Sequence, residues 1–255
     1  MENLEYKQLI ISKRVIQHLG KDLITTSDVA LTELLKNSID AGSDKIRIHI
    51  ADNMHEMEKN CGEFLIDYNQ QVKTSIPKDI MSCPVCIIED MGKGMDTQEL
   101  DNGFLTIGTD LKKTEHEMMF GEKGIGRLAA QRLGKYLLIE TASVKEEFAS
   151  TTFIDWNGDL LTNVENNNVL VPYRKINKVA SHYTRLWIFD INPYDFLETP
   201  DQLTLNIDTF GTVLVNPQLK TAINFLLSPF EKRSNQISFF YDGKEVDIEF
   251  PKELL

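Results

Sequence analysis

The stretch TTSDVALTELLKNSIDAG, residues 25–42, decides the interpretation of this chain. Its apolar residues recur with the three- and four-residue spacing of an amphipathic helix, at Val29, Leu31, Leu34, Leu35 and Ile39. Thr26, Ser27 or Asp28 can cap the first turn, and Gly42 can end the last. The pattern predicts one helix over these residues.

Three polar residues of this predicted helix share one face. Glu33, Asn37 and Asp40 stand at i, i+4 and i+7, close to the apolar stripe. A carboxylate four residues from an amide, at the margin of a core, could hold a divalent cation and a water molecule. The alternative is a solvated helix surface.

A second stretch, IIEDMGKGMD at residues 87–96, joins a strand to a glycine turn. Its neighbourhood VCIIED is typical of a buried strand, which would end at Asp90. Gly92 and Gly94 would let the backbone turn sharply beneath a flat ligand. The aspartate could then accept a hydrogen bond from an exocyclic amine. The alternative is a strand followed by an ordinary glycine turn.

A third stretch, EKGIGRLAAQRLG at residues 122–134, places two glycines before a predicted helix at about 125–133. Glycine inside a regular element costs about 0.5–1 kcal/mol relative to alanine, so the pair needs a reason. One reason is a phosphate group, held by backbone amides at the positive end of the helix. The candidate donors are the amides of Gly124, Ile125 and Gly126, with charge added by Lys123 and Arg127. The alternative is a tight turn between a loop and a helix.

Taken in this order, the three stretches resemble the GHKL ATPases, the superfamily of DNA gyrase, Hsp90, histidine kinases and MutL. The resemblance covers about residues 5–190. ELLKNSIDAGSDKIRIHI is most similar to the MutL and MORC members, and FLTIGTD with GEKGIGRLAAQRLG is similar to bacterial Hsp90-like and MORC-like proteins. The resemblance implies an α+β fold of the Bergerat type. This is a two-layer α/β sandwich whose mixed, mostly antiparallel sheet carries helices on one face.

The resemblance also implies a role for each matching residue. Glu33 would be the general base that polarises the attacking water, and Asn37 would ligate Mg²⁺, with Asp40 also in the cofactor site. Asp90 would bind the adenine amine. Other residues would line the nucleotide, at the base Gly92, Gly94 and Met95, and at the phosphates Gly121, Lys123, Gly124, Ile125, Gly126 and Arg127.

A fourth family element, a Gly-Thr step on a late strand, is half present. Thr184 fits it and would contact adenine through a water molecule. Tyr183 stands where the family has glycine, which puts the local backbone in question.

The same resemblance implies a domain plan. Residues 1–233 would form the ATP-binding domain, with a lid at about 96–123, and residues 234–255 a C-terminal hairpin that could begin a transducer-like domain. The domain would bind ATP with Mg²⁺ and hydrolyse it slowly to ADP and phosphate. It would act as a clamp or conformational switch that forms a homodimer with ATP, in which residues 1–12 could take part. An effector domain would follow in a larger bacterial protein, and DNA repair and phage defence are two compatible settings.

Two other functions stay open at this point. A regulatory module would bind nucleotide without significant hydrolysis. A histidine-kinase-type phosphotransfer domain would share the fold, but the residues before the Glu33 helix are too few for the helical module that usually carries the phosphorylated histidine.

Composition limits the partners. The chain has 255 residues, with 42% hydrophobic and 26% charged, a balance typical of a globular domain. Its formal net charge of −12 disfavours DNA binding through this domain alone. The start MENLEYKQLI is no signal peptide, and no apolar run is long enough to span a membrane. We therefore expect a cytoplasmic protein without a membrane partner.

The cysteines point to no special chemistry. Cys83 and Cys86 form a CPVC motif that runs into a predicted strand rather than a helix. Cys61 and the five histidines offer no further pair of zinc ligands. We expect buried or half-buried thiols.

The remaining segments predict further elements. We expect a helix over 5–20 ending at Gly20, a half-buried strand over 45–52, its neighbour over 63–69, and a helix within 97–107 followed by a loop over 108–123. We also expect an antiparallel meander with strands at 136–143, 150–158 and 182–191, a helix over 217–231, and a hairpin over 236–250 turned at Asp242-Gly243.

Overall fold

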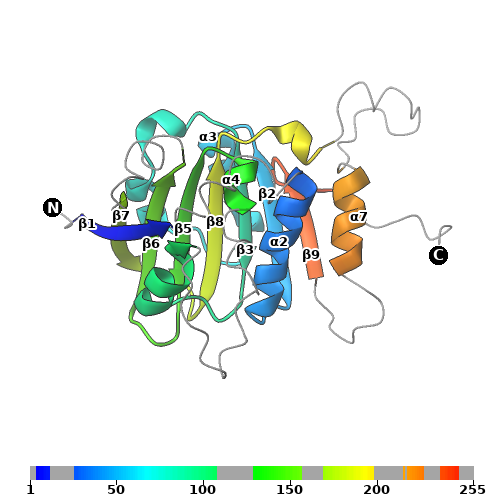
Figure 1. The fold of residues 1–255 in the computed structure, drawn as a ribbon. Helices are drawn as coiled ribbons and strands as arrows, with labels where there is room; N and C mark the ends of the chain where they lie inside the picture. The colour runs from blue at the N-terminus through cyan, green and yellow to red at the C-terminus, as the bar shows by residue number, and fades with distance from the viewer. Residues whose placement is uncertain are drawn as a thin grey trace, which may run out of the picture.

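One sheet carries the fold in the computed structural model, which describes residues 4–11, 26–107, 129–156, 169–197, 215, 217–226 and 236–246. Within these ranges the strands lie in the order β10-β9-β2-β3-β8-β5-β6-β7-β1-β4 (Figure 1). Their bounds are β1 Glu5–Ile11, β2 Lys45–Ala51, β3 Val85–Asp90, β4 Thr106–Ile107, β5 Tyr136–Ala142, β6 Phe148–Asp155, β7 Val169–Asn177, β8 Tyr183–Phe189, β9 Gln236–Tyr241 and β10 Lys244–Val246. Only β1·β4 and β2·β9 pair in parallel among the described strands, so the predicted mixed, mostly antiparallel sheet is confirmed.

Three helices cover one face of this sheet: α2 (Ser27–Asp40), α4 (Ala129–Leu133) and α7 (Pro217–Leu226) (Figure 1). α2 packs against both of the others. Its buried side carries Ala30, Leu31, Leu34, Leu35 and Ser38. The predicted stripe therefore docks the helix, except that Val29 is exposed. Fully burying one such leucine is worth about 1.5–3 kcal/mol, which fixes α2 against the sheet.

Both ends of α2 lie where the sequence places them. Thr26 is the N-cap residue, with an extended backbone whose carbonyl accepts the first helical hydrogen bond, from Ala30 N. Gly42 follows the last turn with φ +85°, a conformation that favours glycine. The chain can thus turn directly from α2 into β2.

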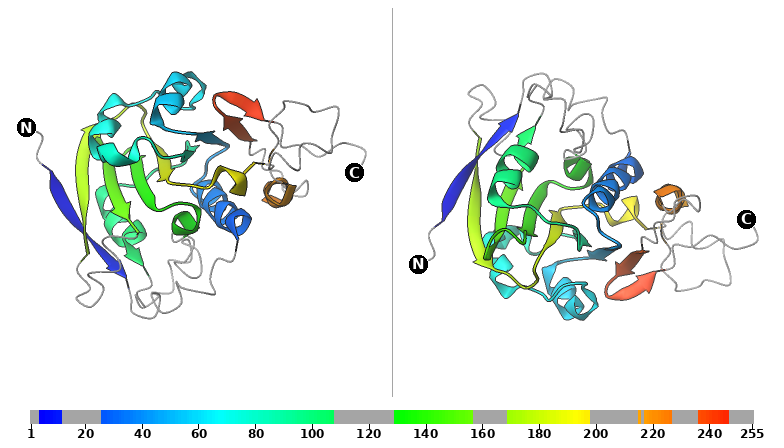
Figure 2. Two further views of the ribbon diagram at one scale, coloured as in Figure 1. Left: turned by 90° about the horizontal axis from the view of Figure 1, so that it is seen from above. Right: turned by 90° about the horizontal axis from the view of Figure 1, so that it is seen from below.

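The opposite face of the sheet is also covered, which the sequence did not indicate. Figure 2 shows α3 (Met54–Lys59) on the side of the sheet away from α2 and α4. The chain continues there through the 3₁₀ segments η1 (Cys61–Glu63), η2 (Gln70–Ser75) and η3 (Lys78–Ile80). A second apolar cluster forms beneath them, with Phe64, Ile66, Val72 and Trp187 among its members.

This cover corrects two predictions. β2 is not half-buried, because His49 is only 2% exposed and lies between the rings of Phe64 and Phe240, at centroid distances of 4.7 and 4.9 Å. Residue 63 is the last residue of η1, and residues 64–69 form no strand. The carbonyls of Ile66 and Asp67 accept hydrogen bonds from the Arg185 side chain instead of joining a ladder.

The predicted helix over 5–20 is wrong in its described part, since residues 5–11 form β1. The strand pairs with β7, and its inward residue Leu9 is buried. Lys7 binds Asp101, and its ammonium lies 4.2 Å from the centre of the Tyr173 ring. These partners are distant in sequence, so local spacing could not reveal them. Residues 12–25 lie outside the described part.

The predicted strands β5, β6 and β8 are present, but they do not follow one another as a simple meander. β7, which was not predicted, pairs with β6, and β8 returns to lie between β5 and β3. Pro172 interrupts the strand-like sequence of β7. The crossing brings β8 beside β3, where the site forms.

The remaining predictions are largely confirmed where the chain is described. A π-helix, η4 (Glu99–Phe104), lies within 97–107, and a short 3₁₀ segment, η7 (Pro193–Asp195), follows β8. The hairpin β9–β10 turns at Asp242-Gly243, and β9 lies parallel to β2 within the main sheet. The domain boundary at 233/234 stays a prediction. The predicted loop over 108–123 lies outside the described residues.

Candidate functional site

Asp90 is the buried centre of the candidate site. It ends β3, and its side chain is held by two donors: Gly92 N donates to Oδ1 at 2.9 Å, and Ser38 Oγ donates to Oδ2 at 2.8 Å. The residue is only 5% exposed. Burial raises the pKa of this carboxyl to about 6, although both hydrogen bonds pull it down.

Asp90 belongs to a row of residues that crosses three strands. It pairs with Thr184 on β8, and Thr184 pairs with Thr141 on β5. The two threonine hydroxyls lie 3.2 Å apart. Thr141 Oγ1 also accepts from Met95 N at 2.9 Å and donates to Tyr183 O at 3.0 Å, which leaves Thr184 as the donor between the hydroxyls. The row thus ties three predicted base-site residues, Asp90, Met95 and Thr184, into one structure.

The glycine turn after Asp90 fits a space that no larger residue could share. A Cβ on Gly94 would lie 1.8 Å from the carbonyl oxygen of Ala142, and the residue has φ +65°. A Cβ on Gly92 would lie 2.7 Å from Cβ of Ala41 at the end of α2. Lys93 N donates to Ala41 O at 3.0 Å. The turn is therefore wedged between α2 and β5, as the D-x-G-x-G pattern predicted for a sharp turn.

His182, which directly precedes β8, contacts the same turn. Its Nδ1 lies 2.7 Å from the carbonyl oxygen of Gly92. A carbonyl oxygen only accepts, so Nδ1 carries the hydrogen. This contact could not be predicted from local sequence patterns, because His182 lies far from Gly92 along the chain.

The α2 residues lie next to this row. Glu33 is half-buried, whereas Asn37 and Asp40 are exposed. Ser38, which directly follows Asn37, reaches Asp90. α2 therefore connects the predicted metal-binding residues to the predicted base-binding residue. The predicted phosphate-binding residues, Gly121, Lys123, Gly124, Ile125, Gly126 and Arg127, lie outside the described residues.

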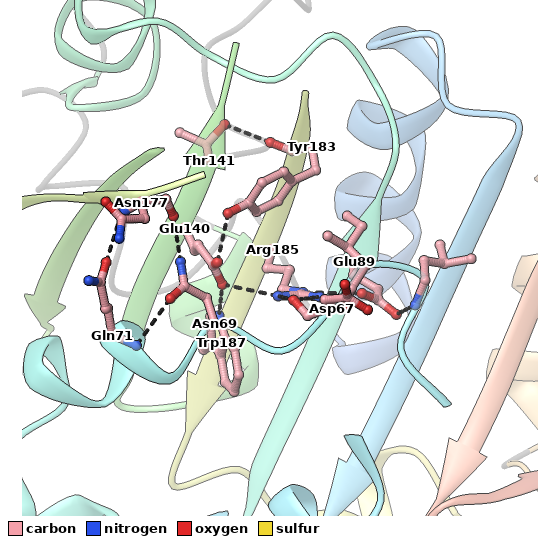
Figure 3. A network of polar contacts seen from close by, with 12 residues as sticks. Asp67, Asn69, Gln71, Glu89, Glu140, Thr141, Asn177, Tyr183, Arg185 and Trp187 are labelled. Carbon is pink, nitrogen blue, oxygen red and sulfur yellow. Dashed lines mark hydrogen bonds and ion pairs between the residues drawn. The ribbon is translucent and has the colours of Figure 1, made fainter. Parts of the chain in front are cut away.

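Tyr183, which stands where the family has glycine, lies with Thr184 in the regular strand β8. Successive residues of a strand point to opposite faces, so its side chain lies on the face opposite Thr184. There its hydroxyl donates to Glu140 Oε1 at 2.8 Å (Figure 3). The residue is fully buried there. The tyrosine therefore takes no space on the helix-covered face.

An open cavity of about 480 Å³ lies at the start of the predicted lid, apart from the Asp90 row. Its lining is Asp96, Thr97, Gln98, Asp101, Asn102, Lys145 and Glu146. Lys145 already pairs with Asp96 and Glu99. None of the predicted base-site residues lines this cavity, so it does not define the candidate site.

Metal-ligand clusters and paired cysteines are absent from the described part of the chain. No group of three histidine, cysteine or acidic residues there could hold a metal ion. Cys83 and Cys86 are free thiols, half-buried and buried, as predicted, and burial raises the pKa of Cys86. None of the helices in the described ranges is long and apolar enough to cross a membrane.

A comparison with protein families gives one match, to the histidine kinase-, DNA gyrase B- and HSP90-like ATPases, over residues 24–184. A comparison with curated proteins gives no match. The matched range contains α2, the D-x-G-x-G turn and Thr184, and covers more than half of the chain. The nearer resemblance to MutL and MORC proteins stays a prediction. The chain belongs to the family of histidine kinase-, DNA gyrase B- and HSP90-like ATPases.

Proposed function

We propose that this chain binds ATP with Mg²⁺ and hydrolyses it slowly, as the ATP-dependent switch of a larger protein. One observation carries the proposal: a buried carboxylate, Asp90, is held by Ser38 and the glycine turn in the same row as Thr184. A buried carboxylate with fixed donors needs a reason, because burying a charge is costly. Recognition of a ligand amine is such a reason.

Asp90 would select adenine by its chemistry. A carboxylate oxygen accepts the hydrogen bond that the exocyclic amine donates, and it would repel the carbonyl oxygen that guanine presents instead. Gly92 and Gly94 would let the backbone turn sharply beneath the flat base, and Met95 would pack against the base, since Met95 is only partly buried. Thr184 would reach the base through a water molecule.

Glu33 and Asn37 would serve the phosphate end. The exposed Asn37 amide oxygen suits Mg²⁺, which prefers oxygen ligands, and Asp40 lies one turn further along α2. Bound Mg²⁺ would neutralise charge on the phosphates. The half-buried Glu33 would orient the attacking water and accept its proton. Gly121, Lys123, Gly124, Ile125, Gly126 and Arg127 would hold the phosphates.

Coupling to a homodimer would run through the first strand. β1 pairs with β4 inside the predicted lid, and Lys7 binds both carboxylate oxygens of Asp101 at 2.6 and 2.7 Å. Movement of the lid would therefore displace β1 and, with it, residues 1–12. Release of ADP and phosphate would reopen the clamp, provided that ATP binds the closed state better. A C-terminal effector domain would receive the signal, and DNA contact would fall to that domain rather than to this acidic one.

Turnover of a Glu33→Gln variant tests the hydrolysis. We expect ATP turnover to fall by at least about 100-fold, with Mg·ATP affinity retained, because a general base is worth 10²–10⁴ in rate. Glu245→Gln on β10 makes the same change at an exposed site and should leave turnover unchanged. Equal turnover by Glu33→Gln and the wild type would favour the regulatory module. Phosphohistidine formed from labelled ATP would favour the phosphotransfer domain.

A further inference from the structure

A second row of polar residues crosses the same strands one position away from the Asp90 row. Glu89 on β3 pairs with Arg185 on β8, and Arg185 pairs with Glu140 on β5. All three side chains are fully buried. Successive residues of a strand point to opposite faces, so this row lies behind the Asp90 row, on the face covered by residues 54–81.

Arg185 holds this row together (Figure 3). Its Nε donates to Glu89 Oε2 at 3.1 Å, and its Nη1 lies 3.5 Å from Glu140 Oε2. The guanidinium also donates to the carbonyls of Ile66 and Asp67. One planar group therefore contacts two neighbouring strands and the covering segment at once.

Both oxygens of each carboxylate in the row have partners. Glu140 accepts from the Tyr183 hydroxyl at 2.8 Å and from Trp187 Nε1 at 3.3 Å. Burial raises the pKa of Glu140, and the Arg185 charge opposes that rise. Glu89 Oε1 accepts from Leu65 N at 2.5 Å and lies 3.1 Å from His49 Nε2. Buried polar networks whose members are paired in this way make a core more rigid.

We propose that Arg185 is a positioning residue for base recognition. By holding β3, β8 and β5 at fixed spacing, it sets the relative positions of Asp90, Thr184 and Thr141 on the other face. Thr184 and Arg185 are adjacent in β8, as Asp90 and Glu89 are in β3, so a shift of the rear row moves the front row with it. This inference rests on the proposed binding of ATP.

Lysine cannot take over this position. An ammonium is a point charge without the planar fork that spans Glu89, Glu140 and the two carbonyls. Arg185→Lys keeps the charge and removes the geometry. Arg174→Lys is the matched control: Arg174 extends the same row across β6 to β7, two strands beyond Glu140, and is half-exposed.

The test compares the affinity of ATP with that of purine riboside triphosphate, which lacks the 6-amino group, by calorimetry with Mg²⁺. For the wild type and for Arg174→Lys, we expect removal of the amine to weaken binding about tenfold or more, as for a lost hydrogen bond to a charged group. For Arg185→Lys the two affinities should agree within about twofold, because the amine no longer meets Asp90 in position. A purely structural Arg185 would lower stability without changing this ratio.

The outcomes separate the two proposals. An unchanged ratio in folded Arg185→Lys, checked by near-ultraviolet circular dichroism, overturns the positioning role. If that variant does not fold, Glu140→Gln decides by the same ratio, since it removes the negative charge beside Arg185 and keeps one acceptor oxygen, for either Tyr183 or Trp187. A wild type that binds neither nucleotide, or binds both equally, contradicts the proposed function instead.

Discussion

The Ser38 hydroxyl on α2 donates a 2.8 Å hydrogen bond to Asp90 at the end of β3. Both residues are buried, at 4% and 5% exposure. Ser38 directly follows Asn37, so this bond connects the helix that would bind Mg²⁺ to the strand that would bind adenine. The two halves of the candidate site are thereby held at a fixed separation.

Removing this bond by Ser38→Ala should cost about 1–3 kcal/mol of unfolding free energy, because a buried charged acceptor loses a donor. The pKa of Asp90 should rise further, since the Ser38 hydrogen bond now lowers it. Chemical denaturation measures the first effect. Ser82→Ala, at an exposed serine, should be neutral, and an equal effect of the two variants would contradict the account.

The raised pKa of Asp90 predicts a pH dependence of stability. The folded state holds a proton at Asp90 up to about pH 6, whereas the unfolded chain loses it near 3.8. Stability from this group is therefore complete below the unfolded value and is lost as the pH rises through the folded one. Asparagine does not titrate. The unfolding free energy of Asp90→Asn, relative to that of the wild type, should therefore increase by up to about 3 kcal/mol between pH 4 and 7.

Denaturant melts of both proteins at several pH values measure this difference. Asp79→Asn, at an exposed aspartate in η3, serves as the control and should follow the wild type throughout. A stability difference between Asp90→Asn and the wild type that stays constant from pH 4 to 7 would show that Asp90 titrates normally.

Gly94→Ala should be strongly destabilising, by about 2 kcal/mol or more, since its Cβ would overlap Ala142 O at a positive φ. Gly103→Ala is the matched control, because a Cβ there meets nothing within 4 Å inside η4. That variant should be neutral or gain up to about 1 kcal/mol. Thermal melts compare them, and a Gly94→Ala protein as stable as Gly103→Ala would refute the close packing of the turn.

Elements with a strong local pattern were predicted well. α2 has an apolar stripe and a terminal glycine, β3 begins with four apolar residues, and the Asp242-Gly243 turn is a direct hairpin signal. β1 was predicted as a helix because a short apolar run fits either period, and its partner β7 is distant in sequence.

The candidate site could be proposed from the sequence only where its pattern is local, and its roles stay predictions. Asp90, its glycines and the α2 face are local patterns. Ser38, Thr141 and His182 contribute through contacts between distant segments, and a charged residue such as Arg185 usually lies on a solvated face. Only the cover provided by residues 54–81 makes that face an interior one.

Calorimetric titration of Mg·ATP into the wild type, Asp90→Asn and Asp79→Asn tests the central claim most directly. We predict binding by the wild type and by Asp79→Asn, and a loss of at least about tenfold in affinity for folded Asp90→Asn. Asparagine carries no charge and keeps only one acceptor oxygen, for which Ser38, Gly92 N and the ligand amine would compete. ATP binding of equal strength by all three proteins would contradict the assignment of adenine to Asp90.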